Sequence, residues 1–279
     1  MKLLILFSTL CFSFFILPSQ ACTLKMGYRT TARLPNIEAQ PSNKGLYLDL
    51  YTKAAKRIGC QLEVSRQPKK RILRDLGRGT LDFYPGLSFR EERSLYILFF
   101  ANGLPSADIG LTRVEVPEIN SFYDLKGKSI LRAYGGTSVD ANEYGVTIKT
   151  PPELSFESAI DYILNKNADF YEDEIGTLSY YLKDHPRAKE LKFHLNCCGG
   201  LTELTVGFSR ASPHLKEEAN PDYDPSKELD YNNFPKRVAE RSTAYRFQQA
   251  LMELKKEGYT NNLFLQYYGV NIEELLSKK

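Results

Sequence analysis

Residues 45–65 read Gly-Leu-Tyr-Leu-Asp-Leu-Tyr-Thr-Lys-Ala-Ala-Lys-Arg-Ile-Gly-Cys-Gln-Leu-Glu-Val-Ser, a helix pattern followed by a strand pattern. The apolar side chains at helical spacing are Leu46, Leu50, Ala54 and Ile58. Gly59 comes directly after the last of them, where a glycine commonly ends a helix. The strand-like residues 61–65 follow at once. A helix that leads into a short apolar strand is typical of α/β proteins.

The same alternation extends on both sides of this stretch. Residues 24–28 form a short apolar strand pattern before the helix, and residues 69–78 form a second helix pattern, which Gly79 ends. Residues 81–84 are again strand-like. Strand, helix, strand, helix and strand in this order predict a parallel α/β sheet.

A second α/β unit begins after Pro117. It contains strand patterns at 129–133 and 168–171 and, between them, a helix pattern that Ser155 is suited to cap. Residues 217–237 interrupt the rhythm with three prolines and several acidic residues, which indicates a surface excursion. The sequence therefore predicts two α/β units.

The N-terminus has the features of a secretory signal. Residues 3–17 are almost wholly apolar, and Ser19-Gln20-Ala21 offers the small residues that a signal peptidase needs. The apolar run is too short for a comfortable membrane span, so we expect cleavage after Ala21 and secretion. An uncleaved anchor is one alternative. A lipid on Cys22 is another, although lipid attachment favours leucine at the position that Ser19 occupies.

Composition and charge are those of an ordinary globular protein. Removal of 21 of the 279 residues leaves 258, enough for two domains. The chain is 42% hydrophobic and 25% charged, and its formal net charge falls from +3 to +2 with the loss of Lys2. A charge so near zero gives no support to a nucleic-acid or anionic-membrane partner.

Four cysteines remain after the predicted cleavage, and an oxidising compartment favours disulfides. Three pairings are possible. Cys22 and Cys60 each stand at the start of a predicted strand, and these strands are expected to be neighbours, so this pairing is favoured. Cys197 and Cys198 would then form a vicinal bridge or remain a free pair. With His194 they offer three metal ligands on one short stretch, a weak signal, and no metal or other cofactor is expected.

Nine short motifs occur in order along the chain. They lie at residues 24–28, 45–50, 76–82, 86–93, 124–128, 136–138, 168–170, 250–258 and 266–269. The most informative are Leu-Gly-Arg-Gly-Thr-Leu-Asp at 76–82 and Gly-Leu-Ser-Phe-Arg-Glu-Glu-Arg at 86–93. In identity and order the nine resemble the bacterial extracellular solute-binding proteins of family 3, the amino-acid-binding group. Together they span nearly all of the mature chain.

The resemblance implies a two-lobed periplasmic-binding-protein fold of type II, an α/β architecture in which each lobe is a mixed sheet flanked by helices. Lobe 1 would comprise residues 22–112 and 206–279, and lobe 2 would comprise residues 113–205. The resemblance also implies a monomer in the periplasm whose lobes close around a small ligand by hinge motion.

The resemblance places the ligand carboxylate against four side chains. Arg93 matches the position whose guanidinium grips an α-carboxylate, and its planar fork makes two charge-assisted hydrogen bonds to such a group. Ser88 matches a hydroxyl that supports the same carboxylate. From the second lobe, Thr137 and Ser138 at a predicted helix start would bind its other side.

The resemblance also places an acid for the ligand ammonium after the strand that begins at Asp169. Counting forward gives Glu174, with Asp173 as the next candidate and Glu172 adjacent. Alternation along a strand would put Glu172 and Glu174 on one face and Asp173 on the other.

The sequence departs from the family in the first loop, where an acidic residue and a stacking aromatic are usual. Arg29 and Ala32 occupy those positions, and Tyr28 nearby is a further ligand-binding candidate whose side chain could lie on either face of its strand. A basic segment lies where the cleft rim is expected, and its cations are Arg66, Lys69, Lys70 and Arg71. If Arg29, Lys70 or Arg71 faces the cleft, the ligand should carry extra negative charge. We therefore expect an acidic or otherwise anionic ligand.

These features predict a solute-binding protein that delivers an amino-acid-like ligand to an inner-membrane permease for ABC-type uptake, without enzymatic activity. A sensor that docks on a membrane receptor would have the same fold and ligand chemistry, with residues 217–237 as a candidate docking surface. A periplasmic dehydratase on this fold is a third interpretation, in which Glu172, Asp173 or Glu174 would act as general acid or base. None of the three histidines matches an expected cleft position.

Overall fold

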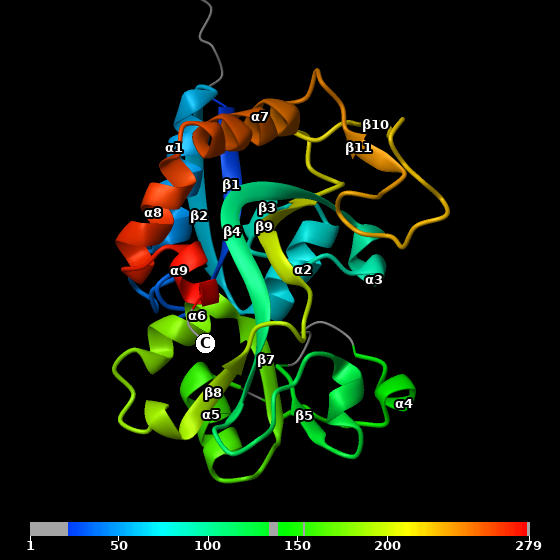
Figure 1. Cartoon of the computed structure of the whole chain (residues 1–279). Coiled ribbons are helices and arrows are strands. Elements are labelled where there is room, and N and C mark those ends of the chain that lie inside the picture. The colour runs from blue at the N-terminus through cyan, green and yellow to red at the C-terminus, as the bar shows by residue number, and fades with distance from the viewer. Residues whose placement is uncertain (1–21, 134–138, 153, 278–279) are drawn as a thin grey trace, which may run out of the picture.

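The computed structural model describes residues 22–133, 139–152 and 154–277 (Figure 1). The predicted signal and the predicted ligand residues Thr137 and Ser138 lie outside this part of the chain. None of the helices within it is long and apolar enough to cross a membrane.

The first β-α-β unit forms as its sequence predicts. Helix α1 (Leu46–Arg57) ends just before Gly59, whose φ of +75° lies in the left-handed region that favours glycine. Strand β2 (Cys60–Gln67) follows and pairs in parallel with β1 (Cys22–Arg29) along its whole length. Helix α1 is therefore the crossover between two neighbouring parallel strands.

The chain then builds the other side of this sheet. Helix α2 (Lys69–Gly77) leads to β3 (Phe83–Pro85), which lies parallel to β1. The short helix α3 (Glu91–Ser94) precedes β4 (Ile97–Arg113), a strand of 17 residues. The first part of β4 runs antiparallel to β9 (Gly200–Ser209), which also pairs with β3.

Strand β4 continues beyond this first group of strands into a second one (Figure 1). There it pairs antiparallel with β7 (Phe170–Glu174) and β8 (Leu191–His194). Strand β5 (Ser129–Leu131) lies parallel to β7 and to β6 (Thr147–Lys149). The order is β2-β1-β3-β9-β4-β7-β5-β6, with β8 on β4. Both lobes are thus mixed α/β structures joined through β4 and β9.

Helices flank the second group of strands. They are α4 (Ala141–Tyr144), α5 (Phe156–Leu164), α6 (Ile175–Leu182) and the 3-10 turns Phe122–Leu125 and Ala188–Glu190. Ser155 caps α5 as predicted, because its hydroxyl accepts a hydrogen bond from the backbone N–H of Ser158 at 3.1 Å.

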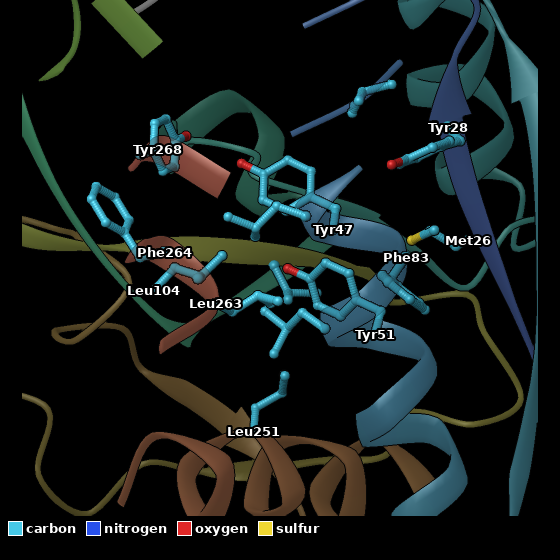
Figure 2. Packing of buried hydrophobic residues seen from close by; sticks show 14 of the residues in the cluster. Met26, Tyr28, Tyr47, Tyr51, Phe83, Leu104, Leu251, Leu263, Phe264 and Tyr268 are labelled. Carbon is cyan, nitrogen blue, oxygen red and sulfur yellow. The ribbon is translucent and has the colours of Figure 1, made fainter. Parts of the chain in front are cut away.

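The C-terminal helices close the core of the first lobe. They are α7 (Thr243–Lys256), α8 (Tyr259–Tyr268) and α9 (Ile272–Ser277). Figure 2 shows the rings of Tyr51 and Phe83 between Leu251 of α7 and the first strands, and the Tyr51 and Phe83 centroids are 5.2 Å apart. Helices α8 and α9 also contact α6, so the C-terminus packs against the second lobe.

The segment that interrupts the α/β rhythm is a hairpin. Strands β10 (Glu217–Ala219) and β11 (Lys236–Val238) form a separate two-stranded antiparallel sheet, and a long loop connects them. Most of that loop is exposed or half-exposed, as the prediction of a surface excursion requires.

Both disulfides are formed. Cys22 and Cys60 join the first residues of β1 and β2, with Cα atoms 4.5 Å apart, which confirms the favoured pairing. Cys197 and Cys198 form a vicinal bridge, so the free-pair alternative does not apply. Their sulfurs are therefore not thiolate ligands, and within 22–133, 139–152 and 154–277 no three His, Cys, Asp or Glu side chains are grouped as a metal site.

The two disulfides should differ in their effect on stability. The Cys22–Cys60 bridge closes a loop with a sequence separation of 38, which lowers the entropy of the unfolded chain and stabilises the fold by about 4 kcal/mol. The Cys197–Cys198 bridge joins adjacent residues and closes almost no loop. We expect Cys22→Ser/Cys60→Ser to lower the free energy of unfolding far more than Cys197→Ser/Cys198→Ser in urea denaturation. Equal losses would contradict this account.

Candidate functional site

A cavity of about 350 Å³ lies where the two groups of strands meet. Its volume is within the range of small-molecule sites. The ionisable side chains that line it are Arg29, Arg33, Lys69, Arg93, Asp108, Arg132, Glu157, Glu172, Asp173 and Glu174. The cavity is thus highly charged, and residues of both lobes form its walls.

Arg93 is part of the first-lobe wall. Helix α3 places Arg93 there, and the residue is only 5% exposed. Its Nη1 donates a hydrogen bond to the backbone carbonyl of Ser88 at 3.1 Å. Ser88 lines the cavity as well, so the structure brings together two of the four residues predicted to hold the carboxylate. The Ser88 carbonyl orients the guanidinium.

Two further cations stand on the same wall. Arg29 is the last residue of β1, and Lys69 is the first residue of α2. Burial, together with the charges of Arg29, Arg93 and Arg33, lowers the pKa of Lys69 to about 7. Its ammonium therefore loses its proton readily unless an anion lies beside it.

The basic segment at the start of α2 contributes a different residue from the two expected. Lys70 and Arg71 are exposed and do not line the cavity, whereas Lys69 does. Residues one or two apart on a helix point in different directions, so only one of the three can face the cleft. The segment thus places one cation, Lys69, at the cavity.

Tyr28 also lies elsewhere than expected. Its side chain is fully buried in the first-lobe core, and its hydroxyl donates a hydrogen bond to the carbonyl of Asn36 at 3.0 Å (Figure 2). Successive residues of a strand point to opposite faces, so Arg29 reaches the cavity and Tyr28 does not.

The opposite wall carries the three consecutive acids. Glu172, Asp173 and Glu174 all line the cavity, although alternation predicted that one would face away. Strand β7 ends at Glu174, which is already the N-cap of α6. The strand rule therefore stops applying at this residue.

Glu174 uses both carboxylate oxygens to cap α6. They accept hydrogen bonds from the backbone N–H groups of Gly176 at 2.8 Å and Thr177 at 2.7 Å, and from the Thr177 hydroxyl at 2.8 Å. A side chain at Gly176 would lie 2.8 Å from the ring of Tyr268, so glycine allows this close approach. Glu174 is 5% exposed, and burial raises its pKa.

Arg33 reaches across the cavity and was not predicted. Its Nη2 donates to Asp173 Oδ1 at 2.8 Å, and its guanidinium carbon lies 5.2 Å from the ring centroid of Phe156. Next to it, the backbone N–H of Leu34 donates to the hydroxyl of Tyr181 at 3.3 Å. The loop after β1 therefore touches β7, α5 and α6.

Two other ionisable groups at the lobe boundary were also missed. Asp108 lies on β4 opposite Glu174 of β7, and Arg132 follows β5 and forms an ion pair with Glu172. Burial raises the pKa of Asp108 to about 6 and that of Glu172 to about 7. Their sequence neighbourhoods carry no motif, so only the tertiary structure identifies them.

Comparison with known proteins identifies the fold. No protein-family model matches the sequence, and no curated protein matches it. Three solved structures are similar along nearly the whole chain. An ancestral arginine-binding protein bound to arginine is 21% identical, with a TM-score of 0.62 over 88% of this chain and 98% of that chain. The GluR0 ligand-binding core in complex with L-glutamate is 19% identical, with a TM-score of 0.67 over 90% of this chain and 100% of that chain.

The third structure is the substrate-binding protein of an amino acid ABC transporter. It is 19% identical, with a TM-score of 0.61 over 89% of this chain and 100% of that chain. The three similarities establish the two-lobed α/β fold that the sequence motifs indicate.

The low pKa of Lys69 predicts that neutralising this residue stabilises the ligand-free protein. Below about pH 7 the ammonium is charged in both the folded and the unfolded protein. Its charge lowers the stability of the folded protein only, because it is buried there beside other cations. We expect Lys69→Gln to raise the free energy of unfolding by about 1 kcal/mol near pH 6, a value discounted for solvent contact. The gain should shrink above pH 7, because the folded wild type then loses the proton. Urea denaturation at several pH values measures the difference in the free energy of unfolding between Lys69→Gln and the wild type. A difference that grows with pH would contradict the low pKa of Lys69.

Proposed function

We propose that this protein is a periplasmic solute-binding protein that captures a small, acidic, amino-acid-like ligand by hinge closure for ABC-type uptake. The observation that carries the proposal is the cavity between the lobes, with the buried guanidinium of Arg93 on its wall. A buried arginine fork is suited to a carboxylate, because two parallel N–H donors match its two oxygens.

Hinge closure requires two lobes, and strands β4 and β9 connect the two groups of strands. We propose lobe 1 as residues 22–112 with 206–279, and lobe 2 as residues 113–205. The pairing of β4 with β9 shifts register between Ala101 and Pro105, within the segment where the chain leaves the first group of strands. An irregular step in two connecting strands is a suitable place for small backbone changes that reorient whole lobes.

The acidic character of the proposed ligand rests on the first-lobe wall. Arg29, Lys69 and Arg93 contribute three cations there. A second carboxylate on the ligand would keep Lys69 protonated despite its low pKa, so the charges of ligand and wall would reinforce each other. Among the similar structures, the GluR0 core is bound to L-glutamate and an ancestral protein to arginine. The three cations of the first-lobe wall favour an acidic ligand, as in the GluR0 core.

A hydrolytic or eliminating enzyme on the same scaffold is a second candidate. Asp108 and Glu172 have pKa values of about 6 and about 7, which suit general acids and bases at neutral pH. Turnover of prephenate or arogenate by the purified protein would favour this candidate. Tight binding of an unreacted ligand would favour the solute-binding function.

Ligand binding should depend on the fork of Arg93. A thermal-shift screen of the mature protein, refolded after removal of bound ligand, would test amino acids, dicarboxylates and small peptides. A ligand at a hundred times its Kd adds about 2.7 kcal/mol of stability. We expect an acidic ligand to give this shift in the wild type, and Arg93→Ala and Arg93→Lys to weaken its binding about a hundredfold.

Arg57→Ala is the matched control. It removes an arginine whose partners are Glu253 and Glu257 on the surface, away from the cavity, and should leave binding unchanged. Binding that survives in Arg93→Ala, or tighter binding of lysine or arginine than of an acidic ligand, would count against the proposed site.

A further inference from the structure

We propose that Arg33 is a built-in cation at the acidic end of the cavity, so that the preferred ligand is a small dicarboxylic acid without an α-ammonium group. This inference rests on the proposed function and specifies its ligand. It makes Arg33 a specificity-determining residue, since the chain itself supplies the positive charge that an amino acid would bring.

The first step of the argument is the state of Asp173. Its Oδ1 accepts from Arg33 Nη2 and from the backbone N–H of Glu174, both at 2.8 Å. Its Oδ2 accepts from the hydroxyl of Tyr171 at 2.6 Å. Three donors, one of them a guanidinium, satisfy this carboxylate. A ligand ammonium would have to displace Arg33 or share oxygens that are already occupied.

The second step is the state of the neighbouring acids. Both oxygens of Glu174 are hydrogen bonded to the start of α6, and Glu172 is paired with Arg132. The charges of Arg33 and Arg132 also act on Asp108, although burial raises its pKa to about 6. The three acids of β7 are therefore each offset by a cation of the chain or by a helix N-terminus.

The third step is the contrast with the first-lobe wall. Within the part of the chain that the structure describes, no hydrogen bond or ion pair joins the Lys69 ammonium to a carboxylate, and Arg29 Nε is buried without a hydrogen-bond partner. These groups need an anion from outside the chain. Together with Arg93 they can receive two carboxylates, whereas the acidic end needs no cation.

An amino acid would pay an electrostatic cost in such a cavity. Its ammonium would lie near the Arg33 guanidinium, or would push that guanidinium from Asp173 and leave it without its counter-ion. A ligand with a ketone or hydroxyl in place of the ammonium avoids both outcomes. Its oxygen can also accept a hydrogen bond from the arginine.

The test compares 2-oxoglutarate with L-glutamate, which share a carbon skeleton and both carboxylates and differ only at the α position. Isothermal titration of the mature protein at about pH 7 measures both Kd values. We expect 2-oxoglutarate to bind about tenfold or more tightly, since hydrogen bonds to charged groups contribute that much. Succinate and aspartate form a second matched pair of shorter ligands, for which the same preference is expected.

The variant Arg33→Gln should reverse this preference. It frees Asp173 to bind an ammonium, so the ratio of the two Kd values should shift toward L-glutamate by about tenfold. Arg57→Gln removes a surface arginine and should leave the ratio unchanged. Thermal unfolding verifies that each variant is folded. If Arg33→Gln does not fold, the ratio of the two Kd values in the wild type decides whether the cavity prefers 2-oxoglutarate.

The outcomes separate this inference from the proposed function. Absence of binding by all four acids to folded wild type would overturn the proposed function. Tighter binding of L-glutamate than of 2-oxoglutarate would leave the solute-binding function standing and overturn the role of Arg33. A ratio of the two Kd values that is the same in folded Arg33→Gln as in the wild type would also overturn the role of Arg33. Loss of L-glutamate binding in Asp108→Asn would then assign the ammonium to Asp108.

Discussion

Strand β4 is the constraint on which the arrangement of the site depends. It pairs with β9 in the first lobe and with β7 and β8 in the second, so one continuous backbone holds both walls of the cavity. Helix α3, which carries Arg93, comes just before β4, and the acids of β7 lie along its other half. Because hydrogen bonds between strands fix these distances, small changes in β4 alter the separation of the two walls.

The two walls carry opposite charge patterns, and each has a structural origin. The cations of the first lobe come from the end of β1, the start of α2 and the short helix α3, where the backbone direction changes. The acids of the second lobe come from the end of β7, where a helix begins and its N-terminus attracts negative charge. Arg33 is the exception, since it belongs to the cationic lobe and lies among the acids.

Local patterns predicted the unit of β1, α1, β2, α2 and β3, as well as β5, α5, β7 and the Cys22–Cys60 bridge, because helix spacing and strand starts depend on nearby residues. They did not predict β4 or β9, whose pairing joins distant parts of the chain. The motif around Arg93 likewise placed that residue beside the cavity. Tyr28 was misplaced because strand alternation gives two faces without saying which is inside. Arg33 could not be found, because its partner Asp173 is distant in sequence and becomes a neighbour only when the lobes come together. Glu174 lines the cavity, and its engagement with α6 depends on where β7 ends.

The contacts of the loop after β1 bear on how long a ligand stays. Arg33 holds Asp173, and the backbone of Leu34 holds the hydroxyl of Tyr181, so both contacts must break before the lobes separate. Under the proposed function these contacts would raise the barrier to opening, and related complexes differ mostly in their dissociation rates. The residence time of a captured ligand would then be set in part by two contacts that the chain makes with itself.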